Sequence, residues 1–197
     1  RWMNGRFIRQ MDDDELGERL VVYLTRVGFY GDPVAVEQVA AEGPQALAAA
    51  VESAETAHRP ATAPTAEQAE LTKTLAPLVR EKLEVLADFI PLAGFFFRPL
   101  AFSDEARERL AGTPGAAATL ARAAADLRAV EPWTVAAIEA LVRELPAQLG
   151  VKRKAVFAAL RLGMSGQTVT PGLFESLWAL GRDEAVARLE QAARLLD

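Results

Sequence analysis

Apolar side chains recur at intervals of three and four residues along much of the chain, which is the spacing of one face of an α-helix. The first stripe follows an acidic run at residues 12–14, whose side chains can cap a helix start. Gly28 then ends this predicted helix, whereas residues 1–11 are expected to be extended or irregular. The residues of the stripe are Leu16, Leu20, Tyr23, Leu24 and Val27.

A longer stripe predicts a helix over residues 71–90. Pro77 lies inside it and Pro91 directly after it, and we expect them to kink or divide the helix, because proline has no backbone N–H to donate. The preceding residues 31–64 hold Ala-rich helical stretches broken at Gly43 and end in a Pro/Ala/Thr-rich segment typical of a linker or insert. The residues of the longer stripe are Leu71, Leu75, Leu78, Val79, Leu83, Leu86 and Ile90.

The second half of the chain has the pattern of short helices separated by cap residues, glycines and prolines. We place a domain boundary directly after Arg98, which gives domains 1–98 and 99–197. Nowhere does a convincing strand pattern occur, so the predicted fold class is all-α. The helix starts expected in the second half lie at Ser103, Thr113-Pro114, Thr134, Val151, Thr170-Pro171 and near Asp183.

Composition agrees with a folded helical protein and excludes several kinds of catalytic and metal-binding site. Of the 197 residues 51% are hydrophobic, which is enough for a core, and the absence of cysteine excludes disulfides and thiolate catalysis. The one histidine, His58, has no acidic residue at a fixed spacing, and residues 12–14 suit helix caps better than a metal site. With no triad pattern and no phosphate-binding glycine loop, we predict no catalytic residue and no metal in this chain.

Targeting signals are also missing from the sequence. No apolar run approaches the roughly 20 residues of a membrane span, so we expect no membrane partner. The first residues lack the pattern of a signal peptide and do not begin with Met. We therefore expect the chain to be a fragment or a processed product.

Charge is distributed unevenly along the chain. The net charge is −5, and residues 31–70 hold seven acids and one base, a net of −6, which leaves the remaining residues at +1. The basic clusters outside this acidic stretch have two interpretations: ordinary solvated charges, or a local footprint for a polyanion. One of them, Lys152-Arg153-Lys154, opens a predicted helix, where positive charge opposes the helix dipole. It is either a frayed, solvated turn or a set of contacts to a phosphate backbone.

Two further features allow both a structural and a binding role. In the segment 170–174, Leu173 and Phe174 stand just inside a predicted helix start, where one can pack inward while the other offers a surface for an unstacked base. Simple core packing is the alternative. Arg80 and Lys82 flank the longer stripe on opposite sides, so only one of them can readily face a single groove.

Motifs at both ends of the chain carry a family resemblance. Residues 1–9 read RWMNGRFIR, residues 160–166 read LRLGMSG, and residues 170–175 read TPGLFE, with LGR at 180–182. These segments resemble the C-terminal, anticodon-binding half of bacterial glutamyl-tRNA synthetase, in which the patterns W-x-N-G-x-[YF]-I-R and L-R-x-A-x-[TS]-G…[ST]-P-x-[LF]-F-E…L-G-[KR]-[DE] occur. Either motif alone would be a weak signal, but together they are specific.

The resemblance covers residues 1–30 and about 70–197. It implies the all-helical, cage-like anticodon-binding architecture of class I aminoacyl-tRNA synthetases, in two subdomains. It also implies a cytoplasmic parent enzyme, a ligase that joins glutamate to tRNA(Glu) using ATP and Mg²⁺. The catalytic half, whose signatures are absent here, would precede Arg1. The implied partners are tRNA(Glu), with tRNA(Gln) left open, and that catalytic domain, in a monomer; residues 31–64 receive no role.

Anticodon contacts follow from the resemblance, residue by residue. Family members that accept only tRNA for glutamate use an arginine on the long helix to sense the last anticodon base, and Lys82 occupies that place here. Lysine keeps the charge but lacks the planar two-donor fork, so strict discrimination is not implied. Contacts to the phosphate backbone are expected at Lys152, Arg153 and Lys154. The expected anticodon contacts are Arg80, Lys82, Arg143, Arg161, Thr170, Pro171, Leu173 and Phe174.

A second hypothesis treats the chain as a helical protein–protein interaction module without RNA binding. It predicts an exposed apolar groove rather than a basic surface. It gives no reason for the basic run 152–154 and explains neither end motif.

Overall fold

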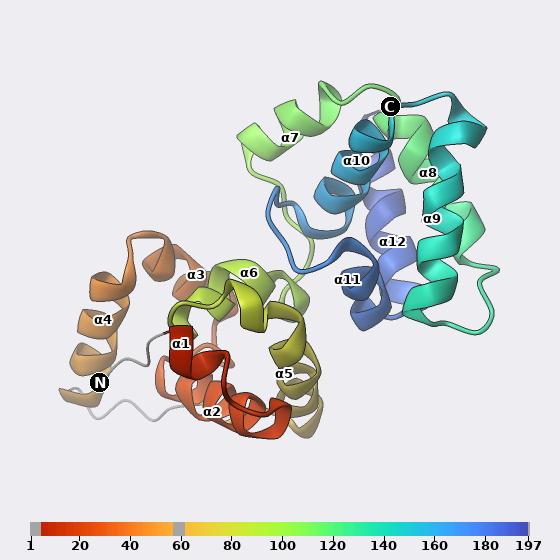
Figure 1. The fold of residues 1–197 in the computed structure, drawn as a ribbon. Coiled ribbons are helices and arrows are strands. Elements are labelled where there is room, and N and C mark those ends of the chain that lie inside the picture. Colours follow the sequence, from red (N-terminus) through yellow and green to blue (C-terminus); the bar gives the residue numbers. More distant parts are fainter. Residues whose placement is uncertain (1–4, 57–61, 197) are drawn as a thin grey trace. The chain divides into compact units, whose positions relative to one another are not determined.

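The computed structural model describes residues 5–56 and 62–196, and every regular element in these ranges is helical (Figure 1). Twelve α-helices and three short 3-10 turns occur there, and no strand, so the all-α prediction is confirmed. The chain divides into two compact units, unit 1 (Arg1–Arg98) and unit 2 (Pro99–Asp197). Within the described ranges, none of the helices has the length and apolar character needed to cross a bilayer.

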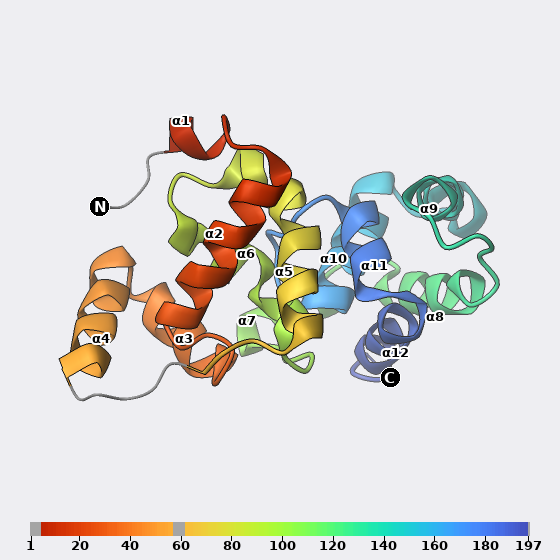
Figure 2. The same ribbon diagram turned by 90° about the horizontal axis from the view of Figure 1, so that it is seen from below.

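Unit 1 is built around two helices that lie side by side, α2 and α5 (Figure 2). Leu16, Leu20 and Leu24 on α2 and Leu75 and Val79 on α5 are fully buried in its core. The stripe over residues 16–27 is therefore a core-facing helix surface, as predicted. The helices of unit 1 are α1 (Gly5–Ile8), α2 (Asp13–Arg26), α3 (Pro33–Ala41), α4 (Pro44–Thr56), α5 (Ala66–Val79) and α6 (Phe89–Ala93).

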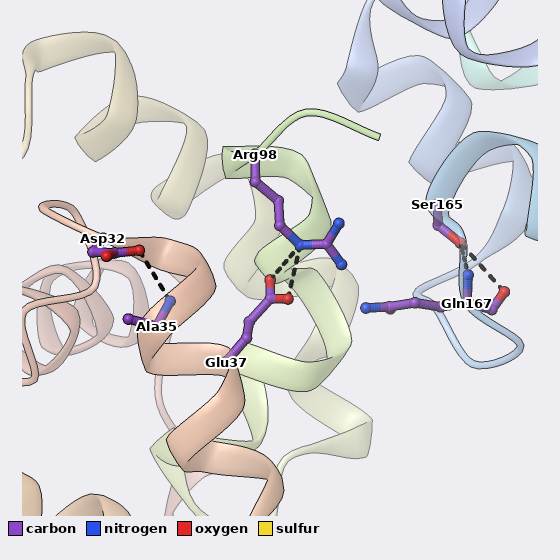
Figure 3. A network of polar contacts seen from close by, with 6 residues as sticks. All are labelled: Asp32, Ala35, Glu37, Arg98, Ser165 and Gln167. Atoms are coloured by element: carbon purple, nitrogen blue, oxygen red, sulfur yellow. Dashed lines mark hydrogen bonds and ion pairs between the residues drawn. The ribbon is translucent and has the colours of Figure 1, made fainter. Parts of the chain in front are cut away.

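Side-chain caps fix where the helices of unit 1 begin. Asp12 accepts the backbone N–H of Glu15 at 2.7 Å, which confirms the predicted start of α2. Asp32 accepts the N–H of Ala35 at 2.9 Å at the start of α3 (Figure 3). The predicted break at Gly43 is also present, since this residue has a φ of 110° between α3 and α4.

One expectation for unit 1 was wrong and another was confirmed. Residues 5–8 form the short helix α1 rather than an irregular lead-in. The longer stripe is divided, as expected: α5 stops at Val79, two residues after Pro77, and 3-10 turns follow at Arg80–Lys82, Leu86–Asp88 and Gly94–Phe97. The carboxylate of Asp88, in the second of these turns, accepts the backbone N–H groups of Glu84 and Val85 at 2.8 and 2.9 Å. In a continuous helix, backbone carbonyls would accept these two N–H groups. Because Asp88 accepts them instead, the helix can end.

Unit 2 packs its helices around one apolar core. Helices α8 and α12 make its most extensive contact, α10 packs on both, and α11 lies against α9 (Figure 1). The fully buried core includes Leu120, Val142, Leu160 and Leu189, one from each of α8, α9, α10 and α12. The helices of unit 2 are α7 (Asp104–Ala111), α8 (Ala116–Leu127), α9 (Val135–Leu149), α10 (Arg153–Ser165), α11 (Leu173–Leu180) and α12 (Arg182–Ala193).

The helix starts of unit 2 agree with the sequence at some positions and differ at others. Ser103 and Thr134 cap α7 and α9 as predicted. The prediction that Thr113 caps the next helix was wrong, because its hydroxyl donates to the carbonyl of Arg109 at the end of α7. Helix α8 instead begins after Gly115, which has a φ of 69°. Similarly, Gly172 and not Thr170-Pro171 precedes α11.

Candidate functional site

One face of α10 carries three residues of interest at four-residue spacing. Arg153, Phe157 and Arg161 follow one another at that interval, which places them on one side of the helix. The guanidinium carbon of Arg153 lies 5.6 Å from the centre of the Phe157 ring. Arg153 is exposed, whereas Phe157 and Arg161 are half-buried. A line of two cations and an aromatic ring therefore follows the surface of α10.

Helices α9 and α11 extend this arrangement sideways. Phe174, in the first turn of α11, meets Phe157 edge to face with a centroid distance of 5.7 Å. The guanidinium carbon of Arg143, on α9, lies 5.5 Å from the centre of the Phe174 ring. We call these four residues, Arg143, Phe174, Phe157 and Arg153, the Arg–Phe row. Each exposed cation–π contact contributes only about 0.5–1 kcal/mol, so these two contacts contribute little to folding.

Arg143 is restrained by a carboxylate on its own helix. Its Nε and Nη2 donate to the same Oε1 of Glu139, at 2.7 and 2.5 Å. The side chain of Arg143 remains 50% exposed, so it is held over Phe174 without being buried.

The segment between α10 and α11 is fixed by Arg161 and Thr170. The Nε of Arg161 donates to the hydroxyl of Thr170 at 3.2 Å, and this hydroxyl donates to the carbonyl of Pro171 at 3.0 Å. Thr170 and Pro171 are both buried. The hydroxyl of Thr170 is therefore used inside the protein, which explains why it does not cap α11.

The beginning of the same segment is held from two sides. The hydroxyl of Ser165 accepts the N–H of Gln167 at 3.0 Å (Figure 3). The same hydroxyl donates to the carbonyl of Arg161 at 2.7 Å. Arg188, almost fully buried on α12, donates to the carbonyl of Met164 at 3.2 Å and pairs with Glu184. These contacts fix the beginning of the segment, and the hydrogen bond between Arg161 and Thr170 fixes its later part. Thr170 and Pro171 are thereby held beside Arg161.

The other residues singled out in unit 2 occupy two different settings. Leu173 is 4% exposed and belongs to the core, so it acts on the surface only by positioning its neighbour Phe174. Lys152, Arg153 and Lys154 are exposed at the start of α10, at the positive end of the helix dipole.

Arg80 and Lys82 belong to unit 1 and lie just beyond the end of α5. Both lie in the 3-10 turn Arg80–Lys82, so the expectation that they sit on a long helix was wrong. The guanidinium of Arg80 forms an ion pair with Asp13 at the start of α2 and is only 21% exposed. Lys82 is exposed.

A second ion pair of unit 1 joins α3 to the end of that unit. The Nε of Arg98 donates to both carboxylate oxygens of Glu37, at 2.9 and 2.7 Å (Figure 3). The two side chains are 12% and 18% exposed. Burial raises the pKa of Glu37, and the charge and hydrogen bond of Arg98 oppose this shift.

In the part of the chain that the structure describes, no group of three or more His, Asp or Glu side chains could hold a metal ion. His58 lies outside the described residues, as do residues 1–4 of the opening motif. The site of unit 2 is therefore one of arginines and aromatic rings, which suits stacking and phosphate contacts.

Sequence reasoning missed three residues of this site. Phe157, Glu139 and Arg188 respectively complete the Arg–Phe row, restrain Arg143 and hold the carbonyl of Met164. For the first two a signal existed, since Phe157 is four residues from Arg153 and Glu139 is four residues from Arg143. Arg188 gave none, because its partner carbonyl lies 24 residues away.

Comparisons with known proteins place this geometry in context. A family model described as "Anticodon binding domain" matches residues 43–193. The glutamate–tRNA ligase of Acidothermus cellulolyticus is 34% identical over 203 residues, which cover all of this chain and 34% of that protein. That of a Roseiflexus species is 31% identical over 98% of this chain and 33% of its own length.

The fold is shared with a solved structure as well. A glutamate tRNA ligase from Elizabethkingia meningosepticum superposes with a TM-score of 0.62 at 18% sequence identity, over 98% of this chain and 31% of the other. The chain thus spans about a third of the length of the relatives that it matches.

Proposed function

Because the chain belongs to the anticodon-binding domain family and its relatives are glutamate–tRNA ligases, we propose that it recognises the anticodon loop of tRNA(Glu). The observation that carries this proposal is the Arg–Phe row beside Arg161 and Thr170. Unpaired loop bases are bound by stacking on aromatic rings and guanidinium groups, and their phosphates by arginine. An interaction module would instead offer an apolar groove, whereas three arginines line this surface.

Roles in unit 2 follow from these settings. Phe174 contributes stacking or shape to the base-binding surface, and Leu173 and Pro171 shape the backbone that presents it. Arg161 contacts phosphates or base edges, with Thr170 fixing its side chain, and Arg143 contacts a base or a phosphate of the anticodon loop. Lys152, Arg153 and Lys154 contact the phosphate backbone, which would offset the unfavourable charge at the start of α10.

In unit 1 we assign Lys82 to the last anticodon base and keep Arg80 as its neighbour. The ion pair with Asp13 restricts Arg80 to a supporting role unless binding replaces that carboxylate. Lys82 lacks the two-donor fork of arginine. This residue is therefore compatible both with a protein that charges only tRNA(Glu) and with one that also charges tRNA(Gln). We assign no role to residues 31–64.

The reaction belongs to the whole protein. We propose that it is a cytoplasmic, monomeric glutamate–tRNA ligase whose catalytic domain binds ATP and Mg²⁺. The described residues of this chain provide no ligand set for the metal, so we derive no catalytic step from them.

Fluorescence anisotropy tests the proposal with labelled anticodon stem-loops for glutamate and glutamine at several salt concentrations. We expect binding to the glutamate loop and, for Arg161→Ala, a salt slope that is smaller by about 0.7 for each single-strand phosphate that Arg161 neutralises. Arg109→Ala, which removes an exposed arginine of α7, is the matched control and should leave the slope unchanged. Absence of binding to either loop would contradict the proposal.

A further inference from the structure

The pair formed by Glu139 and Arg143 raises a question that the anticodon-binding role leaves open. An arginine that binds phosphate needs its charge and its N–H donors available. Two nitrogen atoms of Arg143, Nε and Nη2, donate to the carboxylate of Glu139 at 2.7 and 2.5 Å, and this carboxylate neutralises the charge of Arg143. We propose that Glu139 is a positioning residue that holds Arg143 over Phe174 as a stacking surface for an anticodon base, rather than as a phosphate ligand; this rests on the proposed function of unit 2.

Local geometry supports a stacking role. The spacing of four residues on α9 brings Glu139 and Arg143 together on successive turns, so the carboxylate restrains the long arginine side chain from its own helix. The guanidinium then lies over the Phe174 ring at 5.5 Å, while half of the side chain remains exposed. An incoming base therefore meets a planar cation that is already oriented, which lowers the entropic cost of binding.

The rest of the Arg–Phe row supports Arg143 from behind. Phe174 rests edge to face on Phe157, and Arg153 lies over Phe157 in turn. Phe174 therefore packs against Phe157 as well as Arg143, which leaves Arg143 at one end of the row and Arg153 at the other.

Electrostatics separates the two arginines at the ends of the row. The charge of Arg143 is balanced by Glu139, so a phosphate placed there would face a neighbouring carboxylate. A nucleobase carries no charge, so the neighbouring carboxylate of Glu139 does not repel it. Arg153 stands between Lys152 and Lys154 at the start of α10, a setting that favours phosphate.

Two substitutions in the full chain distinguish stacking from phosphate binding. Arg143→Lys keeps the charge and removes the plane, so we expect roughly fivefold weaker binding of the glutamate anticodon stem-loop with an unchanged salt slope. Retained affinity in Arg143→Lys would overturn the inference, because a lysine can replace an arginine that serves only as a point charge.

Glu139→Gln releases Arg143 and should give the opposite signature. We expect the salt slope to steepen by about 0.7, since the freed guanidinium can reach a phosphate on a single strand. Preference for the glutamate loop over the same loop with altered anticodon bases should fall, because phosphates carry no sequence information. Glu105→Gln is the matched control, since Glu105 pairs with Arg109 by the same spacing on α7.

A measurement without RNA keeps the inference separate from the proposed function. In the free chain, the Nε–H proton of Arg143 should show an upfield ring-current shift from Phe174 in NMR spectra, and Glu139→Gln should remove it. An unchanged signal and unchanged slope in Glu139→Gln would overturn the positioning role while leaving anticodon binding intact. A wild-type chain that binds no stem-loop would overturn the proposed function, and the inference with it.

Discussion

Two arginines of unit 1, Arg80 and Arg98, pair with carboxylates from distant segments, whereas those of the Arg–Phe row in unit 2 lie over aromatic rings. Arg80 reaches back 67 residues to Asp13, and Arg98 reaches back 61 residues to Glu37. In unit 2, Arg143 pairs only four residues away on α9 and stays half exposed. The same type of side chain therefore joins elements at Arg80 and Arg98 and presents a surface in the Arg–Phe row.

This difference indicates where a ligand can be bound at low cost. Removing one partner of a buried ion pair leaves an uncompensated charge, so arginines such as Arg98 are committed to the fold. An exposed arginine over a ring is held by about 0.5–1 kcal/mol, so exchanging its contacts for those of a ligand costs little. A ligand can therefore engage the exposed arginines of the Arg–Phe row at a lower cost than Arg98.

The largest expected effect tests whether Leu173 supports the surface from the core. Leu173→Ala should lower the free energy of unfolding by about 2–5 kcal/mol, because it leaves a cavity beneath the start of α11. Urea unfolding measures this decrease. A change below about 1 kcal/mol would place Leu173 on the binding surface instead.

The largely buried ion pair between Glu37 and Arg98 in unit 1 gives the next largest effect. Arg98→Ala should cost about 3 kcal/mol of stability, since it leaves the Glu37 carboxylate buried without its partner. Arg109→Ala removes an exposed pair and should cost no more than about 0.5 kcal/mol by the same unfolding measurement. Equal effects of the two substitutions would remove the contrast between committed and exposed arginines.

Phe174→Ala should act on binding more than on folding. We expect the anticodon stem-loop to bind more weakly by about 1–3 kcal/mol, the change typical of losing one stacked base, because the substitution removes the ring beneath Arg143. Phe7→Ala, an exposed phenylalanine of unit 1, serves as the control in the same anisotropy titration. Loss of cooperative unfolding in Phe174→Ala would assign this ring to the core and break the contrast.

The pH dependence of unit 1 gives the smallest effect. Because burial raises the pKa of Glu37 above 4.5, the folded state binds its proton more tightly than the unfolded state. The stability that this group contributes is present at low pH and is lost as the pH rises through the raised pKa. The unfolding free energy of the wild type minus that of Glu37→Gln should therefore fall as the pH rises from about 4.5. A difference that rises would show that Arg98 outweighs burial.

Much of the fold follows from local sequence. The caps at Asp12, Ser103 and Thr134 use side chains that bond to the backbone three residues away, so the sequence alone reveals them. The end of α5 does not follow in this way. It depends on Asp88 turning its carboxylate to the N–H groups of Glu84 and Val85, and the apolar stripe continues through that turn.

The candidate site was less accessible to sequence reasoning. Resemblance pointed to Arg143, Arg161 and Phe174, but periodicity gave no means of pairing residues from α9, α10 and α11. The contacts of Phe174 with Arg143 and Phe157 arise from the packing of three helices, which no spacing within one helix encodes.

Photo-crosslinking tests most directly the claim that the Arg–Phe row receives the anticodon. A stem-loop for glutamate that carries a photoreactive uridine in its anticodon would be bound to the chain, irradiated and analysed by mass spectrometry of peptides. We expect crosslinked peptides from α10 and α11 that contain Phe157 or Phe174. Crosslinks found only in segments outside α9, α10 and α11 would contradict it.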